Sequence, residues 1–236
     1  LGVMTIRAGV MIARQCRIGI KDRILIQDAF NLNSMSGLVK FIRKVILGTF
    51  LVEGVGALLY MFVFVPEYGP KGIWISIFNS VSAFCNAGID IIKLNSLCDY
   101  VTNPLINTVT ILLIVISGIG YIVWWDVLRV TKNYKQLGLK CFQRCTLHTK
   151  IALSTTAVLL MSGTVLFFIF EYSNPMTMMN YSLFDKLQAS FFQSVTTRTA
   201  GFATFPQENL TNASAMISLL LMFIGGSPVG TAGGVK

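Results

Sequence analysis

Long apolar stretches dominate this 236-residue chain and restrict what it can fold into. Runs of about 20 residues, enough for a helix to cross the roughly 30 Å hydrocarbon core of a bilayer, occur at about 45–65, 104–128, 150–171 and from 213 onward. Hydrophobic residues make up 54% of the chain and charged residues only 12%, which excludes an ordinary soluble domain. The sequence therefore predicts an all-α membrane protein.

Basic residues gather at the ends of the predicted spans and indicate their orientation. Lys and Arg concentrate in the connectors 14–44 and 129–150, whereas the opposite ends of the spans carry mostly acidic residues. By the positive-inside rule, both connectors lie in the cytoplasm. The same rule accounts for the net charge of +9, so no nucleic-acid partner is expected. We predict a multi-pass protein of the cell membrane, surrounded by membrane lipid.

Few residues could carry catalysis or hold a metal. Cys141, Cys145 and the single histidine, His148, lie close in sequence but lack a fourth ligand, so no zinc site is predicted. The apolar runs contain almost no carboxylate, and a catalytic set of acids and bases cannot be assembled from them. The sequence therefore predicts neither an enzyme nor a covalent cofactor.

Two short motifs, 113 positions apart, follow apolar segments too short to cross a bilayer. They are Ser82-Ala83-Phe84-Cys85-Asn86-Ala87-Gly88-Ile89 and Val195-Thr196-Thr197-Arg198-Thr199-Ala200-Gly201-Phe202. The preceding segments, 72–84 and about 183–197, are predicted to be re-entrant half-helices that enter from the outer side. Because each copy contains two spans, successive copies point the same way. The predicted arrangement is parallel repeats of span, re-entrant pore helix and span around a cation pore.

The backbone of these motifs could bind a dehydrated cation. Non-helical backbone at membrane depth is tolerated only where it is buried in protein or lines a watery cavity. Glycine permits the positive φ values that turn successive carbonyls toward one axis, and the carboxyl end of a short helix favours a cation. For one motif alone, a tight turn between packed helices stays the alternative. The predicted filter residues are Asn86, Ala87, Gly88, Ile89, Thr199, Ala200, Gly201 and Phe202.

Arg198 directly precedes the second filter segment. A cation in the permeation path would repel the ion, so the side chain is predicted to point behind the filter as a structural anchor. Asp185 and Glu208 are both candidate acidic partners, and the sequence does not choose between them.

The end of the chain is too rich in glycine for a regular membrane helix. It is not a phosphate-binding loop, because Val235 separates glycine from Lys236 and an apolar helix precedes it. We predict a flexible intramembrane gate beneath the filter, with a fixed bend in a span as the alternative. The gate residues are Gly225, Gly226, Ser227, Pro228, Gly230, Thr231, Ala232, Gly233 and Gly234.

These three motifs resemble the Trk/Ktr/HKT superfamily of potassium transporters, in particular its bacterial membrane subunits of the TrkH and KtrB type. The connector 21–27 adds to the resemblance. In that family, four repeats surround one potassium filter, and a glycine-rich break in the third repeat gates the path. The implied function is potassium uptake across the cytoplasmic membrane, with sodium as a candidate coupling ion. A secondary transporter of a small solute, whose sites also use broken helices, is the alternative.

The resemblance also implies a division of the chain and a set of partners. Residues 1–36 would be the end of the first repeat plus a connector, 37–149 the second repeat with filter 86–89, and 150–236 the third repeat with filter 199–202. The chain is thus expected to be a fragment of a longer protein. The implied partners are a second copy, forming a homodimer, and a cytoplasmic ring of nucleotide-binding regulatory subunits of the TrkA or KtrA type.

Overall fold

The computed structural model describes residues 38–92, 96–132 and 141–235, and the chain divides into two units, 1–54 and 55–236. Helix α3 (Leu38–Tyr68) begins in the first unit and ends in the second. The further helices are α4 (Lys71–Phe84), α5 (Pro104–Ile119), α6 (Tyr121–Lys132), α8 (Cys141–Arg144), α9 (Leu147–Glu171), α10 (Leu183–Thr196) and α11 (Asn212–Phe223).

The described part of the chain consists of helices and the loops that connect them. Single 3₁₀ turns occur at Cys98–Tyr100 and Gln207–Asn209, and Ile224 and Val235 form an isolated bridge. No strand occurs among the described residues. The predicted all-α class is therefore confirmed, while the predicted first domain, 1–36, lies outside the residues that the structure describes.

Two helices are long and apolar enough to cross a membrane, namely α9 and the segment Phe41–Tyr68 of α3. Only 28% of the most apolar window of α3 and 22% of that of α9 are buried in the structure. Their remaining apolar side chains need lipid or further protein as neighbours. These helices identify a membrane-embedded, multi-pass protein, as predicted.

The predicted span at 104–128 is not one straight helix. It consists of α5 and α6, which meet at a bend of 97°. Gly120 ends α5 with a φ of 96°, and a Cβ on it would lie only 2.6 Å from the Pro228 carbonyl oxygen. The bend brings Trp124 of α6 against Phe84 at the end of α4, with ring centroids 5.7 Å apart. The sequence did not predict this bend, because the apolar run continues across it.

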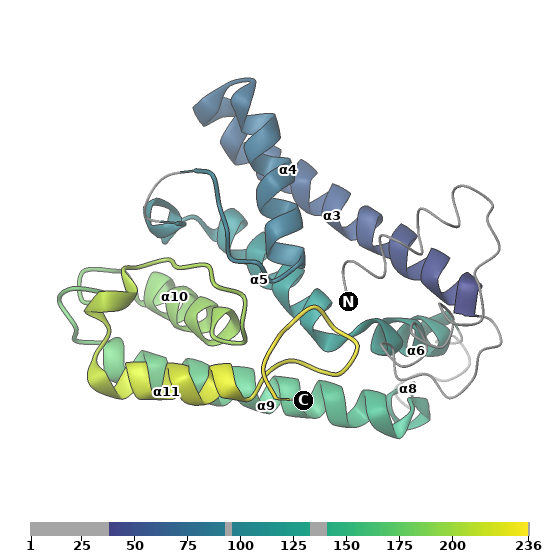
Figure 1. Ribbon diagram of the computed structural model, residues 1–236. Coiled ribbons are helices and arrows are strands. Elements are labelled where there is room, and N and C mark those ends of the chain that lie inside the picture. The colour runs from purple at the N-terminus through teal and green to yellow at the C-terminus, as the bar shows by residue number, and fades with distance from the viewer. Residues whose placement is uncertain (1–37, 93–95, 133–140, 236) are drawn as a thin grey trace. The chain divides into compact units, whose positions relative to one another are not determined.

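The two predicted half-helices are α4 and α10, and each has 14 residues. At 1.5 Å per residue, such a helix is about 20 Å long and cannot span a bilayer. Within the second unit, α4 packs on α5, while α10 packs on α9 and α5 (Figure 1). Gly163 permits the close contact of α9 with α10, since a Cβ on it would collide with the Ser194 hydroxyl.

A buried carboxylate joins the end of α9 to the start of α11. Glu171 is fully buried and accepts hydrogen bonds from Thr177 Oγ1 (2.6 Å) and Asn174 Nδ2 (2.7 Å). It also accepts from the hydroxyl (2.8 Å) and the N–H (2.9 Å) of Thr211, the residue that caps α11. Both carboxylate oxygens are therefore satisfied, and one side chain fixes two helix ends.

Replacing Glu171 by alanine would remove the acceptor of four hydrogen bonds and leave the Thr177 hydroxyl and the Thr211 N–H without another acceptor among the described residues. An unpaired buried donor costs about 1–3 kcal/mol, so we expect the melting temperature of the detergent-solubilised protein to fall by roughly 5 °C or more. Differential scanning calorimetry measures this. Glu208→Ala, at an exposed position, is the control and should leave the melting temperature unchanged. Equal melting temperatures of the two variants would contradict the assigned role of Glu171.

Candidate functional site

The first glycine motif is a turn that leaves the carboxyl end of α4. The N–H of Ala87 still donates to the carbonyl of Ser82 (3.0 Å), and the chain then departs from helical geometry. Asn86 (φ 51°) and Gly88 (φ 65°) have positive φ, and Ala87 between them does not. Asn tolerates this backbone region better than most residues, and Gly adopts it freely.

The second motif repeats this conformation after α10. Thr199 (φ 68°) and Gly201 (φ 89°) have positive φ, and they occupy the same motif positions as Asn86 and Gly88. A β-branched residue at positive φ is strained, so surrounding contacts must hold Thr199 in place. The two motifs therefore share a backbone conformation as well as a sequence pattern.

The two loops touch at their glycines. A Cβ added to Gly88 would lie 2.5 Å from the Ala200 carbonyl oxygen and 2.6 Å from Gly201 Cα. A Cβ added to Gly201 would lie 3.0 Å from Gly88 Cα. Such an approach leaves no room for a side chain at Gly88 and strains one at Gly201. The structure thus brings the two predicted filter segments into backbone contact.

The backbone carbonyls of these loops fall into two groups. The carbonyl oxygens of residues 86–88 and 199–201 accept no hydrogen bond from the described part of the chain. The carbonyls of Ile89 and Phe202, the last residues of the motifs, each accept one from a hydroxyl of the preceding helix. Six carbonyl oxygens therefore remain available to a ligand.

The glycine-rich segment after α11 is a loop that folds back on itself. The helix ends at Phe223, which agrees with the predicted break. The N–H groups of Gly225 and Gly226 donate to the carbonyls of Val235 (3.2 Å) and Gly233 (3.3 Å). A Cβ on Gly225 would collide with the Gly233 carbonyl, so this glycine is required by close packing.

This loop also rests on the bend between α5 and α6 (Figure 1). The Ser227 N–H donates to the Gly118 carbonyl (3.0 Å), and the Thr231 N–H donates to the Ser117 carbonyl (3.3 Å). The last carbonyls of a helix lack partners within the helix, and in a membrane they need another donor. The loop supplies donors at the end of α5.

Side chains of both glycine motifs bind the same loop. Asn86 Nδ2 donates to Thr231 Oγ1 (2.8 Å), and this hydroxyl donates to the Phe84 carbonyl (3.0 Å). Thr199 Oγ1 accepts from the Gly233 N–H at 2.7 Å. Asn86 and Thr199 therefore contact the predicted gate segment from equivalent motif positions.

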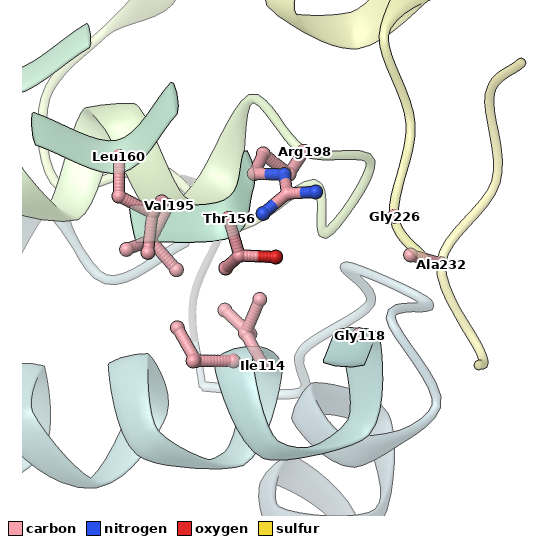
Figure 2. A pocket seen from close by; sticks show the side chains of 9 residues that line it. Ile114, Gly118, Thr156, Leu160, Val195, Arg198, Gly226 and Ala232 are labelled. Carbon is pink, nitrogen blue, oxygen red and sulfur yellow. The ribbon is translucent and has the colours of Figure 1, made fainter. Parts of the chain in front are cut away.

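Arg198 also contacts the loop, and Figure 2 shows it beside a small cavity. Its Nη2 donates to the Gly225 carbonyl (3.1 Å), whereas its buried Nε has no partner among the described residues. The cavity measures about 10 Å³, which is the lower limit for one water molecule. Asp185, one acidic partner considered from the sequence, instead binds Ser182 Oγ at 2.7 Å. The hydrogen bond of Arg198 thus goes to a backbone carbonyl.

Two hydroxyls near the ends of the short helices were not predicted as site residues. Ser82 Oγ donates to the Ile89 carbonyl and accepts from the Ile89 N–H (3.1 Å). Thr196 Oγ1 donates to the Phe202 carbonyl at 2.6 Å. A Ser or Thr in the last turn of a half-helix, followed by a glycine motif, is the signal that could have identified them.

The described residues offer backbone and hydroxyl oxygens rather than a classical metal centre. Within residues 38–92, 96–132 and 141–235, no three His, Cys, Asp or Glu side chains come together in a way that could hold a metal ion. Neutral carbonyl oxygens suit a dehydrated monovalent cation better than a transition metal.

Comparison with known proteins identifies the family to which this chain is similar. The family model of TrkH, a cation transport protein, matches residues 27–236. Over its full length, the chain is 38% identical to the potassium/sodium uptake protein NtpJ of Enterococcus hirae and 37% identical to the Ktr system potassium uptake protein B of Bacillus subtilis. It covers 50% and 51% of those two proteins, so it spans about half of their length.

A solved structure shares the fold. The crystal structure of the potassium transporter TrkH from Vibrio parahaemolyticus matches 90% of this chain and 42% of its own chain, with a TM-score of 0.67 at 16% identity. The prediction of a transporter rather than an enzyme is confirmed by the family description. The resemblance drawn from the glycine-rich motifs is confirmed as well, and the chain belongs to the TrkH family of cation transport proteins.

Proposed function

We propose that this chain is part of the ion-translocating membrane subunit of a Trk/Ktr-type potassium uptake system. The observation that carries the proposal is the backbone contact between Gly88 and Gly201, at the ends of two helices of equal length. Relatives that carry the names potassium/sodium uptake protein and potassium uptake protein support potassium as the substrate, with sodium as a candidate coupling ion.

In this proposal, residues 86–89 and 199–202 are two strands of one selectivity filter. Alternation of positive and negative φ allows successive carbonyl oxygens to face the same side, where they replace the water around the ion. The carboxyl ends of α4 and α10 lead directly into the two loops, and their partial negative charge favours a cation there. The six free carbonyls of 86–88 and 199–201 are the proposed ligands.

The loop 225–234 is the proposed gate. Its contacts with Asn86, Thr199 and the last carbonyls of α5 stabilise one conformation, in which the loop is folded back on itself next to the proposed filter. We take this conformation as the closed state of the gate. Opening would exchange these hydrogen bonds for others. Arg198, bonded to Gly225 at the base of the loop, is proposed as an anchor between the second filter strand and the gate.

The repeats, orientation and partners belong to the same proposal. A long helix, a 14-residue helix, a glycine loop and a further helix follow one another twice, which supports parallel repeats at 37–149 and 150–236. The basic connectors 14–44 and 129–150 face the cytoplasm, and the filter faces outside. The complete subunit would act as a homodimer with a cytoplasmic nucleotide-binding ring of the TrkA or KtrA type.

Serine at Gly88 or at Gly201 should weaken the preference of the complete protein for potassium over sodium. Both positions combine positive φ with close backbone contact, so a side chain must displace the neighbouring filter strand. Strain of about 1–3 kcal/mol corresponds to a fall in the potassium-to-sodium flux ratio of roughly tenfold. Flux of each ion into liposomes measures the ratio.

Gly54→Ser is the control for these two variants. Gly54 has open space where a Cβ would project, so the flux ratio should stay at the wild-type value. An unchanged ratio in both filter variants would exclude the two loops from the filter.

Valine in place of Thr231 should raise the maximal rate of potassium flux. The substitution keeps the side-chain shape but removes the hydroxyl that bonds Asn86 and the Phe84 carbonyl, and so destabilises the closed loop. Two lost hydrogen bonds of about 1 kcal/mol each predict an increase of roughly thirtyfold. Thr164→Val, which removes only a bond to Leu160 within α9, is the matched control. A rate equal to that of the control would argue against a gate held by Thr231.

A further inference from the structure

We infer that Ser82 and Thr196 are positioning residues for ion selection, because their hydroxyls tie the ends of the two filter strands to the helices behind them. Each exposes only 6% of its surface. Thr196 Oγ1 lies 2.6 Å from the Phe202 carbonyl oxygen, and Ser82 Oγ binds both backbone groups of Ile89. This inference rests on the proposed function and adds the residues that fix the filter geometry.

We call the hydrogen bonds of Ser82 with Ile89 and of Thr196 with Phe202 the tethers. Their hydroxyls come from different motif positions, but the carbonyls that they bind occupy the same motif position. With the motifs aligned 113 residues apart, Ile89 corresponds to Phe202, but Ser82 corresponds to Val195 and Thr196 to Ala83. The hydroxyl precedes its carbonyl partner by seven residues in the first loop and by six in the second. The donor position thus differs by one residue between the two motifs, whereas the acceptor carbonyl stays at the same position. We infer that the hydrogen bond serves to hold that carbonyl and is not a simple consequence of the repeated sequence.

The tethers also separate the carbonyls of each strand into one that accepts a hydrogen bond and three that do not. The Ile89 and Phe202 carbonyls accept hydrogen bonds from hydroxyls of the short helices, whereas those of 86–88 and 199–201 accept none from the part of the chain that the structure describes. The tethered residues therefore end the ion-facing part of each strand, and the preceding three carbonyls supply the ligands. An end held by a hydrogen bond to the preceding helix limits how far these three carbonyls can move when a smaller ion enters.

Removal of a tether should loosen the strand without removing a ligand. We expect Thr196→Val, which keeps the shape but not the hydroxyl, to lower the potassium-to-sodium flux ratio of the complete protein about fivefold, the effect of one buried hydrogen bond. Thr196→Ser retains a hydroxyl and should restore most of the ratio. Ser82→Ala should have a comparable effect on the first strand.

Matched controls come from the same helices. Thr197→Val removes a hydroxyl that donates to the Ser194 carbonyl (3.0 Å) within the end of α10. Ser76→Ala removes one that donates to the Gly72 carbonyl (2.7 Å) within α4. Both controls lose a buried hydroxyl but no tether, so their flux ratios should equal that of the wild type.

The test is saturable potassium and sodium flux in liposomes containing each variant of the complete protein, with the ratio and the maximal rate measured separately. A lower ratio in Thr196→Val and Ser82→Ala, with recovery in Thr196→Ser, supports the tethers. Equal ratios in tether and control variants overturn them, even if the maximal rates fall. Absence of any cation flux in the wild-type protein would instead overturn the proposed function.

Discussion

Contact between two glycine loops is the constraint on which the rest of the structure depends. Gly88 and Gly201 approach so closely that neither position has room for an unstrained side chain. The approach requires two short helices, α4 and α10, that stop at the right depth, and each is packed on α5. It also leaves the six carbonyl oxygens of 86–88 and 199–201 without a donor among the described residues, and an apolar environment tolerates such groups only if a ligand or water reaches them.

The bend after α5 and the glycine-rich loop satisfy each other's backbone polar groups. The bend after α5 exposes the carbonyls of Ser117 and Gly118, and the glycine-rich loop supplies their donors. The same loop binds Asn86 and Thr199, so the two glycine motifs, the bend and the loop form one hydrogen-bonded assembly within the second unit. A movement of the glycine-rich loop would therefore alter the hydrogen bonds of both Asn86 and Thr199.

The sequence was sufficient for the features that depend on composition and length. Apolar runs predicted the long helices, segments of about 13 and 15 residues that are too short to cross a bilayer predicted the two half-helices, and glycine content predicted the break after Phe223. The bend at Gly120 could not be predicted, because apolar residues continue on both sides of it. Nor could the tethers of Ser82 and Thr196 or the bonds of Glu171, because they join groups whose distances only the folded chain defines.

The central claim is that both loops bind one ion, and anomalous X-ray diffraction from crystals of the complete protein grown with rubidium tests it directly. Rubidium resembles potassium in charge and coordination and can be located by its own scattering. The account predicts a peak in contact with carbonyl oxygens of both 86–88 and 199–201. Rubidium bound elsewhere in the protein, with no peak between these two loops, would contradict it.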